Sequence, residues 1–229
     1  MTKAREFSRR AVDSAVRADS KEAAASWRAN AALREAELGN TALARQDVAT
    51  ALALSSGRDV KVEAALTLAR IGEASRAKAL AEELEKAYPT STLLKAYWLS
   101  TINAAIEISK GNSSQAIVDL EAAGPYELGS AETAISNLYP VYVRGQAYLL
   151  AHNGAAAAAE FQKLLDHRGI VSNFVIGALA HLQIGRAYAM AGDTAKAKAA
   201  YQDFFTLWKD ADPDIPILKQ AKAEYAKLQ

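Results

Sequence analysis

The sequence has no cysteine, only five prolines, few aromatic residues and almost no net charge. Without cysteine, the chain has no disulfide, no thiolate nucleophile and no cysteine-ligated metal site. With five prolines among 229 residues, long stretches are free to form helices. Aromatic residues make up 7% of the chain, which indicates a core built mainly from small side chains. These shortages favour helices that lie close together.

The charge balance argues against two classes of partner. The chain carries 27 basic and 26 acidic residues, a net charge of +1, and so lacks the basic surface typical of nucleic-acid or anionic-lipid binding. No segment reaches the roughly 18 apolar residues of a membrane span, and the start MTKAREFSRR lacks the apolar stretch of a signal peptide. We expect a soluble segment without direct membrane contact. It is compatible with a cytoplasmic location or with the extracytoplasmic part of a membrane-anchored parent.

What the chain does have is alanine, 52 residues of the best helix former, arranged in an internal repeat. The clearest unit spans residues 177–208. Gly185 and Tyr188 fall on one predicted helix, Gly192 ends it, and Ala197 and Tyr201 fall on a second helix. Because Gly185 and Ala197 have almost no side chain, two antiparallel helices can approach closely there. Gly192 permits the left-handed backbone that ends a helix.

The same pattern of small and aromatic residues recurs at residues 139–166, and three weaker copies precede it. An alanine opens the second helix of each unit: Ala44, Ala77, Ala116, Ala157 and Ala197, with spacings of 33, 39, 41 and 40 residues. The pattern resembles the tetratricopeptide repeat, whose consensus length is about 34 residues. This resemblance implies an all-α fold, a right-handed superhelix of about twelve antiparallel helices with a C-terminal capping helix.

We therefore expect a single domain over residues 1–229. Helix pairs are predicted at 22–54, 58–88, 91–124, 138–168 and 175–209, an orphan second helix at 3–18 and a capping helix at 215–228. The later repeats carry two extra segments, 124–140 and 166–177, which we expect to be surface loops. Such loops either contribute to a binding site or are insertions tolerated on the surface, and the sequence leaves both interpretations open.

Candidate catalytic residues are few. His152, His167 and His181 are predicted in a turn, a loop and a helix, without the paired spacing of a metal site. The stretch DHRGIVSN resembles the catalytic loop of protein kinases, but Gly169 stands in place of the catalytic aspartate. The acidic run DADPD at 210–214 lacks the glycine and distal glutamate of a calcium loop. We expect no catalytic residue, no metal and no cofactor in these residues.

A candidate binding surface follows from the family resemblance, because the first helices of tetratricopeptide pairs line a concave groove. The positions that would face this groove in the third to fifth pairs are Trp98, Thr101, Ile108, Tyr139, Tyr142, Gln146, Leu149, Leu182, Arg186 and Met190. Exposed tryptophan and tyrosine side chains are typical of peptide-binding hot spots. The alternative is that these aromatic side chains pack against neighbouring helices. The lysine and asparagine positions of carboxylate-binding co-chaperones carry other residues here, so that subtype is not expected.

A second resemblance concerns the parent protein. The stretches YPVYVRGQAYLLAHNGAAAAAEFQKLLDHRGIV and AYQDFFTLWKDADPDIPILKQAKAEYAKL are similar to the C-terminal tail of large bacterial serine/threonine protein kinases. No catalytic residue carries over, because the kinase motifs have no counterpart here. The resemblance implies a non-catalytic scaffold that binds a protein or peptide and regulates or recruits for such a kinase. Two alternatives remain: a self-association module that makes the parent a homo-oligomer, and the tail of a winged-helix transcriptional regulator.

Overall fold

The computed structural model describes residues 1–129 and 137–228, and every regular element in them is helical. The first half contains α1 (Thr2–Arg17), α2 (Lys21–Glu37), α3 (Thr41–Leu54), α4 (Arg58–Arg70), α5 (Ala74–Ala87), a π-helix η1 (Leu94–Leu99), α6 (Ser100–Ser109), α7 (Ser113–Asp119) and a 3₁₀ helix η2 (Glu121–Tyr126). The second half contains α8 (Tyr139–Leu150), α9 (Gly154–Asp166), α10 (Arg168–Val171), α11 (Val175–Met190), α12 (Thr194–Leu207) and α13 (Pro216–Ala226). The predicted all-α class is confirmed.

One turn geometry recurs along the chain. The helices joined as α2–α3, α4–α5, α6–α7, α8–α9 and α11–α12 are connected by a residue with positive φ: Gly39, Gly72, Gly111, His152 and Gly192. After each turn, a backbone N–H donates to the carbonyl five residues earlier at 2.8–2.9 Å. This hydrogen bond closes the helix end, and glycine adopts the required conformation without strain. The α1–α2 turn has the same geometry, with Asp19 at φ +52°.

Small residues set the close approach of paired helices. All five predicted opening alanines are fully buried. A methyl group at Gly145 would lie 2.6 Å from the Phe161 ring, and one at Gly185 would lie 3.0 Å from the Tyr201 ring. Because any larger side chain would push the second helix outward, these glycines and alanines allow the aromatic rings to pack directly against the facing backbone.

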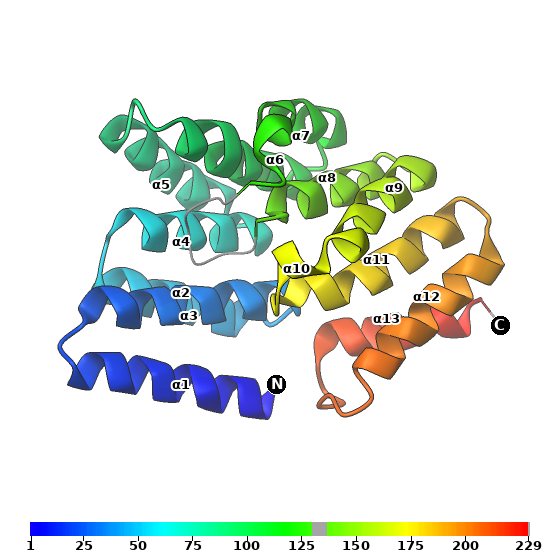
Figure 1. The fold of residues 1–229 in the computed structure, drawn as a ribbon, viewed down its shortest axis with the longest axis horizontal. Helices are drawn as coiled ribbons and strands as arrows, with labels where there is room; N and C mark the ends of the chain where they lie inside the picture. Colours follow the sequence, from blue (N-terminus) through cyan, green and yellow to red (C-terminus); the bar gives the residue numbers. More distant parts are fainter. Residues whose placement is uncertain (130–136, 229) are drawn as a thin grey trace.

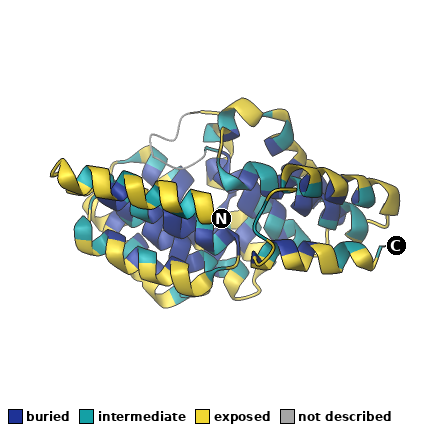
Figure 2. Ribbon diagram, turned by 90° about the horizontal axis from the view of Figure 1, so that it is seen from below, coloured by how far each residue is buried: buried dark blue, intermediate teal, exposed yellow. Residues whose placement is uncertain are grey.

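The first helices of successive pairs form the inner layer. α2 packs against α4, α4 against α6, α6 against α8 and α8 against α11, and each also packs against its own second helix. Buried residues concentrate along these inner helices, and the outer faces are exposed (Figure 2). In an open repeat array each unit contacts only its neighbours. Here the stack curves back on itself, so that α11 also contacts α2 (Figure 1).

The two ends of the stack meet. The Ile217 N–H at the start of α13 donates to the Leu38 carbonyl at the end of α2, at 3.3 Å. The amino group of Met1 forms an ion pair with Asp212 at 2.8 Å. α13 also packs on α12, the position expected of a capping helix. The right-handed superhelix expected from the family resemblance stays a prediction.

The two extra segments are only partly loops. In the first, the 3₁₀ helix η2 extends to Tyr126 and Pro140 lies in the first turn of α8. Residues 130–136 of the expected loop lie outside the described residues. The second segment contains the short helix α10, so it is more regular than the expected surface loop.

Candidate functional site

Half of the ten residues predicted to face a concave groove lie in the interior. Trp98, Thr101, Tyr139, Tyr142 and Leu182 are buried, each at most 2% exposed. The others are partly buried, Ile108, Gln146, Leu149 and Arg186, or exposed, as Met190 is at 40%. The inner helices face one another across the stack, so Trp98 and Tyr142 have no free surface to offer a peptide, and Tyr139 contributes only a 1% exposed side chain to the wall of a cavity.

Their rings pack against one another and against neighbouring helices. The centroids of the Tyr139 and Tyr142 rings lie 6.2 Å apart, and the Tyr142 and Phe161 centroids lie 5.9 Å apart, both edge-on. Trp98 meets Tyr97 edge-on at 4.8 Å. This is the packing that the sequence left open as the alternative to an exposed hot spot. The expectation of exposed aromatic groove residues is therefore corrected for Trp98, Tyr139 and Tyr142.

A polar network runs through the same interior. The Arg70 guanidinium donates to both oxygens of Glu37 at 2.7 and 2.9 Å, and the Tyr139 hydroxyl donates to Glu37 at 3.2 Å. The Arg70 guanidinium also lies 5.9 Å from the centre of the Tyr142 ring. Burial opposes the charge on Arg70, but the Glu37 carboxylate outweighs it and raises the pKa of the guanidinium. This network joins α2, α4 and α8.

A second set of polar contacts extends the network to the C-terminal helices. The Gln183 amide donates to the Tyr142 hydroxyl at 3.3 Å. Arg186 donates to both oxygens of Glu224, each at 2.9 Å, and the Tyr201 hydroxyl donates to Glu224 at 2.8 Å. Arg186, predicted as a ligand-binding cation, is thus occupied by a carboxylate from α13. Through Arg186 and Tyr201, Glu224 links α11, α12 and α13.

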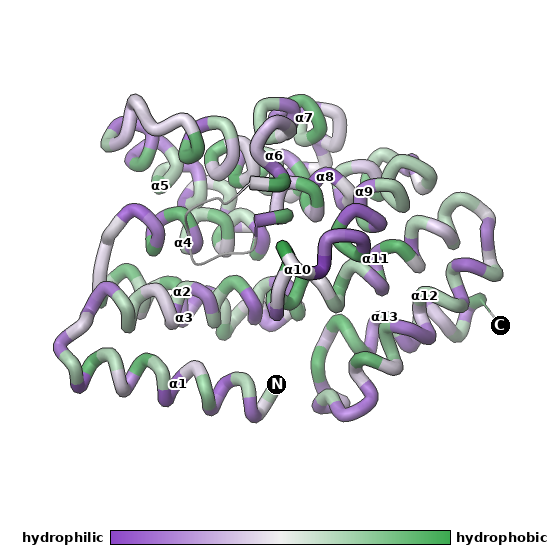
Figure 3. The backbone as a smooth tube through the Cα atoms, in the orientation of Figure 1, coloured by the Kyte–Doolittle hydropathy of each residue, from purple (hydrophilic) through white to green (hydrophobic). Residues whose placement is uncertain are grey.

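A cavity lies elsewhere, between α1 and α2 and beside the segment that precedes α11. We call it the α1–α2 groove; its volume is about 840 Å³ and its walls include Ala4, Phe7, Trp27, Leu33, Arg34 and Phe174. Phe7 is 61% exposed and Trp27 is 53% exposed, which are high fractions for side chains of this size. Arg10 covers part of the Phe7 ring at 5.7 Å. Figure 3 shows hydrophobic and hydrophilic residues alternating along α1.

A smaller cavity of about 420 Å³ lies between α1, α2 and α3. We call it the arginine pocket, because Arg5, Arg9, Arg28 and Arg34 line it together with Glu35 and Asp47. Arg5 donates to both oxygens of Glu35 at 2.9 Å, and Arg28 donates to Asp47 at 3.0 Å. Burial raises the pKa of Asp47, and Arg28 opposes that rise. Arg34 lines both cavities.

Sequence reasoning did not select Phe7, Trp27 or Arg34. It considered only the first helices of the third to fifth pairs, whereas these side chains come from α1 and α2. One signal was present in the sequence. Trp27 is the only large apolar residue between Ala23 and Ala32, so it stands beside alanines that are buried. A single tryptophan among small core residues indicates a side chain directed away from the helix-packing face.

His167 and His181 have separate polar contacts. His167 Nδ1 lies 2.8 Å from the Lys163 carbonyl, and His181 Nδ1 lies 3.9 Å from Asp203. Burial lowers the pKa of His181. Within the described residues, no group of three or more histidine, aspartate or glutamate side chains is placed to hold a metal ion. The lack of a catalytic residue or cofactor stays a prediction from the sequence.

Across the described part of the chain, no helix is both long and apolar enough to cross a membrane. No model of a known protein family matches the chain, and no curated protein matches it.

Proposed function

We propose that this chain is a non-catalytic scaffold that binds a peptide or protein segment in the α1–α2 groove. The observation that carries the proposal is the exposure of Phe7 and Trp27 along one cavity of about 840 Å³. Exposed apolar surface of this kind marks interaction sites, and tryptophan is the residue most enriched at binding hot spots. The buried residues of the inner layer leave the groove at the end of the stack as the better candidate surface.

Replacement of Trp27 tests this site. The ligand probe is a pool of acetylated, amidated hexapeptides with Leu, Phe, Ile, Ser and Glu at random positions, titrated in a calorimeter. Trp27→Ala should weaken binding by about 2 kcal/mol or more, because the variant loses the large apolar contact surface. Its melting temperature should stay near that of the wild type, since the side chain is half-exposed.

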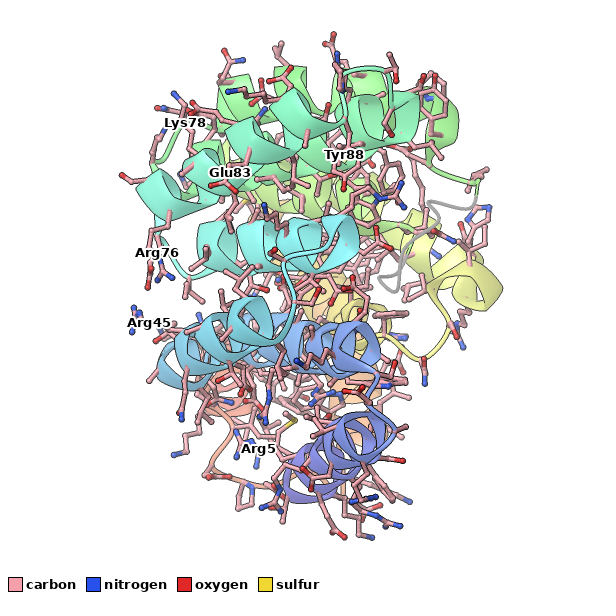
Figure 4. The ribbon with its side chains drawn as sticks, turned by 90° about the vertical axis from the view of Figure 1, so that its left-hand side faces the viewer. Arg5, Arg45, Arg76, Lys78, Glu83 and Tyr88 are labelled. Atoms are coloured by element: carbon pink, nitrogen blue, oxygen red, sulfur yellow. The ribbon has the colours of Figure 1, made fainter. Side chains whose placement is uncertain are left out.

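The matched control is Tyr88→Ala. Tyr88 is also an exposed aromatic residue, at 39%, but it lies at the end of α5, away from α1 (Figure 4). This variant should bind the pool as the wild type does. Equal affinities of the wild type and Trp27→Ala for the peptide pool would exclude the groove as the binding site. If neither the wild type nor the variants bind the pool, the result would count against the scaffold function.

The similarity to kinase tails supports a further proposal, which concerns the parent protein. The scaffold would serve as the regulatory or recruitment tail of a bacterial serine/threonine protein kinase. The natural reading frame tests this directly, because a kinase domain should be encoded upstream of Met1. A winged-helix domain at that place would favour the transcriptional regulator instead.

Self-association is the second candidate function, and the same exposed pair of Phe7 and Trp27 supports it. Two copies could cover each other's α1–α2 groove. Sedimentation equilibrium at tens of micromolar distinguishes the two proposals. A dimer that Trp27→Ala dissociates would favour self-association, and a monomer that binds the peptide pool would favour the scaffold.

A further inference from the structure

Arg34 differs from the other partly or fully buried arginines of the described chain. Arg70 and Arg186 each hold one carboxylate with two hydrogen bonds, and Arg144 binds Glu127 and Glu160. Arg34 is partly buried, yet its one hydrogen bond goes to a neutral acceptor, the Ser8 hydroxyl, at 2.9 Å. Its Nε, like that of Arg28, is buried without an acceptor among the described residues, but Arg28 has a carboxylate partner and Arg34 has none there. A guanidinium in this state is poorly compensated.

Arg34 lies where its guanidinium could contact a ligand in the groove. Its side chain forms part of the wall between the α1–α2 groove and the arginine pocket. Glu35 and Asp47 are near enough to favour its charge, but burial outweighs them and lowers the pKa of the guanidinium. Both carboxylates have their own arginine partners, Arg5 and Arg28. An anion that enters from the groove would therefore meet a guanidinium that has no carboxylate partner among the described residues.

We propose that Arg34 binds a single carboxylate of a peptide whose apolar side chains lie in the α1–α2 groove. This inference rests on the proposed scaffold function and names the ligand chemistry of that site. A guanidinium offers parallel N–H donors that match the two oxygens of a carboxylate. The occupant is thus an apolar segment with one acidic group, from a glutamate or aspartate side chain or from a C-terminus.

Charge complementarity favours this occupant. Helix α1, which forms one wall of the groove, contains five basic and two acidic residues: Lys3, Arg5, Arg9, Arg10 and Arg17 against Glu6 and Asp13. The chain as a whole is nearly neutral, so α1 is a local concentration of positive charge. A phosphate dianion fits less well, because Glu35 and Asp47 line the arginine pocket and would repel it more strongly than a monoanion.

The test compares four pools of acetylated hexapeptides with Leu, Phe, Ile and Ser at the random positions. Three are amidated and carry glutamate, glutamine or phosphoserine at the fourth position; the last carries glutamine there and a free C-terminal carboxylate. Wild-type protein should bind at least one carboxylate pool tenfold or more tightly than the amidated glutamine pool. Whichever carboxylate pool binds identifies the source of the acid. Tightest binding of the phosphoserine pool would overturn the proposal.

The variant Arg34→Met should lose the tenfold preference while it keeps the weaker binding of the glutamine pool. The matched control is Arg76→Met, because Arg76 is an exposed arginine of α5 that lies away from Arg5 and α1 (Figure 4). This control should keep the preference. Equal binding of acidic and neutral pools by wild-type protein would refute the carboxylate site and leave the scaffold standing. Failure of all four pools to bind would refute both.

A second measurement separates a ligand-binding arginine from a structural one. Removal of a poorly compensated buried charge should leave the melting temperature of Arg34→Met equal to or above that of the wild type. Arg70→Met, which deprives Glu37 of its partner, should lower it clearly. If Arg34→Met melts several degrees lower and still prefers the acidic pool, Arg34 is structural and the proposal is wrong.

Discussion

Four glutamates are buried in the described chain, and three of them face arginine. Glu35 pairs with Arg5, Glu37 with Arg70 and Glu160 with Arg144. Glu63, on α4, is fully buried, and neither of its carboxyl oxygens has a hydrogen-bond partner among the described residues. Burial, and then the nearby charge of Asp59, raise the pKa of Glu63 well above its ordinary value. We therefore predict that this residue makes stability depend on pH.

The sign of this pH dependence follows from the protons that the folded and the unfolded chain bind. Folded Glu63 keeps its proton to a higher pH than the unfolded chain, which releases it near pH 4.5. Stability is therefore lost as pH rises above that value, by about 1.4 kcal/mol for each unit of raised pKa. The variant Glu63→Gln cannot ionise. Relative to the wild type, its free energy of unfolding should rise steadily between pH 4.5 and pH 8 in urea titrations.

The exposed Glu85 provides the control for this pH series. Glu85→Gln should follow the wild type over the whole range. If the difference in unfolding free energy between Glu63→Gln and the wild type were the same at every pH, Glu63 would have the same pKa in the folded and the unfolded chain, and the prediction would be wrong.

At the scale of single helices, the sequence predicted much of the structure. Glycine turns and opening alanines mark the junction of the two helices in each observed pair, because these features act locally through backbone conformation and side-chain size. The predicted pair 91–124 also contains η1 and most of η2, and three elements were not predicted as such. The π-helix Leu94–Leu99 and the short helices η2 and α10 have no repeated signature in the sequence. They depend on packing around the extra segments, which no local pattern encodes.

The close approach of α8 and α9 can be tested at Gly145. In Gly145→Ala, the new methyl group would lie 2.6 Å from the Phe161 ring, so the ring or the helix must move. The variant should lose about 1–3 kcal/mol of unfolding free energy in spite of the better helix propensity of alanine. Chemical denaturation measures the loss.

Gly169 in α10 is the matched glycine, because a methyl group there meets no atom within 4 Å. Gly169→Ala should be neutral or slightly stabilising. If Gly145→Ala were equally harmless, the helices would not be held together at that contact.

At the scale of the whole molecule, the candidate site could not be predicted from the sequence. Repeat geometry suggests an open concave face, and on that basis Trp98, Tyr139 and Tyr142 were expected to contact a ligand. The stack instead closes, with α11 against α2 and the start of α13 hydrogen-bonded to Leu38. Closure involves partners far apart in the sequence, such as Ile217 with Leu38 and Met1 with Asp212, which no local pattern predicts. The surface proposed for binding is instead the groove at one end.

Tryptophan fluorescence distinguishes the groove from the inner layer most directly. Two proteins, each with two of the three tryptophans replaced by phenylalanine, keep only Trp27 or only Trp98, and each is titrated with the acidic hexapeptide pool. We predict a saturable blue shift of the Trp27 emission, because the ligand covers this half-exposed ring, and no change in the emission of Trp98. A shift of the Trp98 emission without a shift of the Trp27 emission would contradict the account and place the binding site at the inner helices.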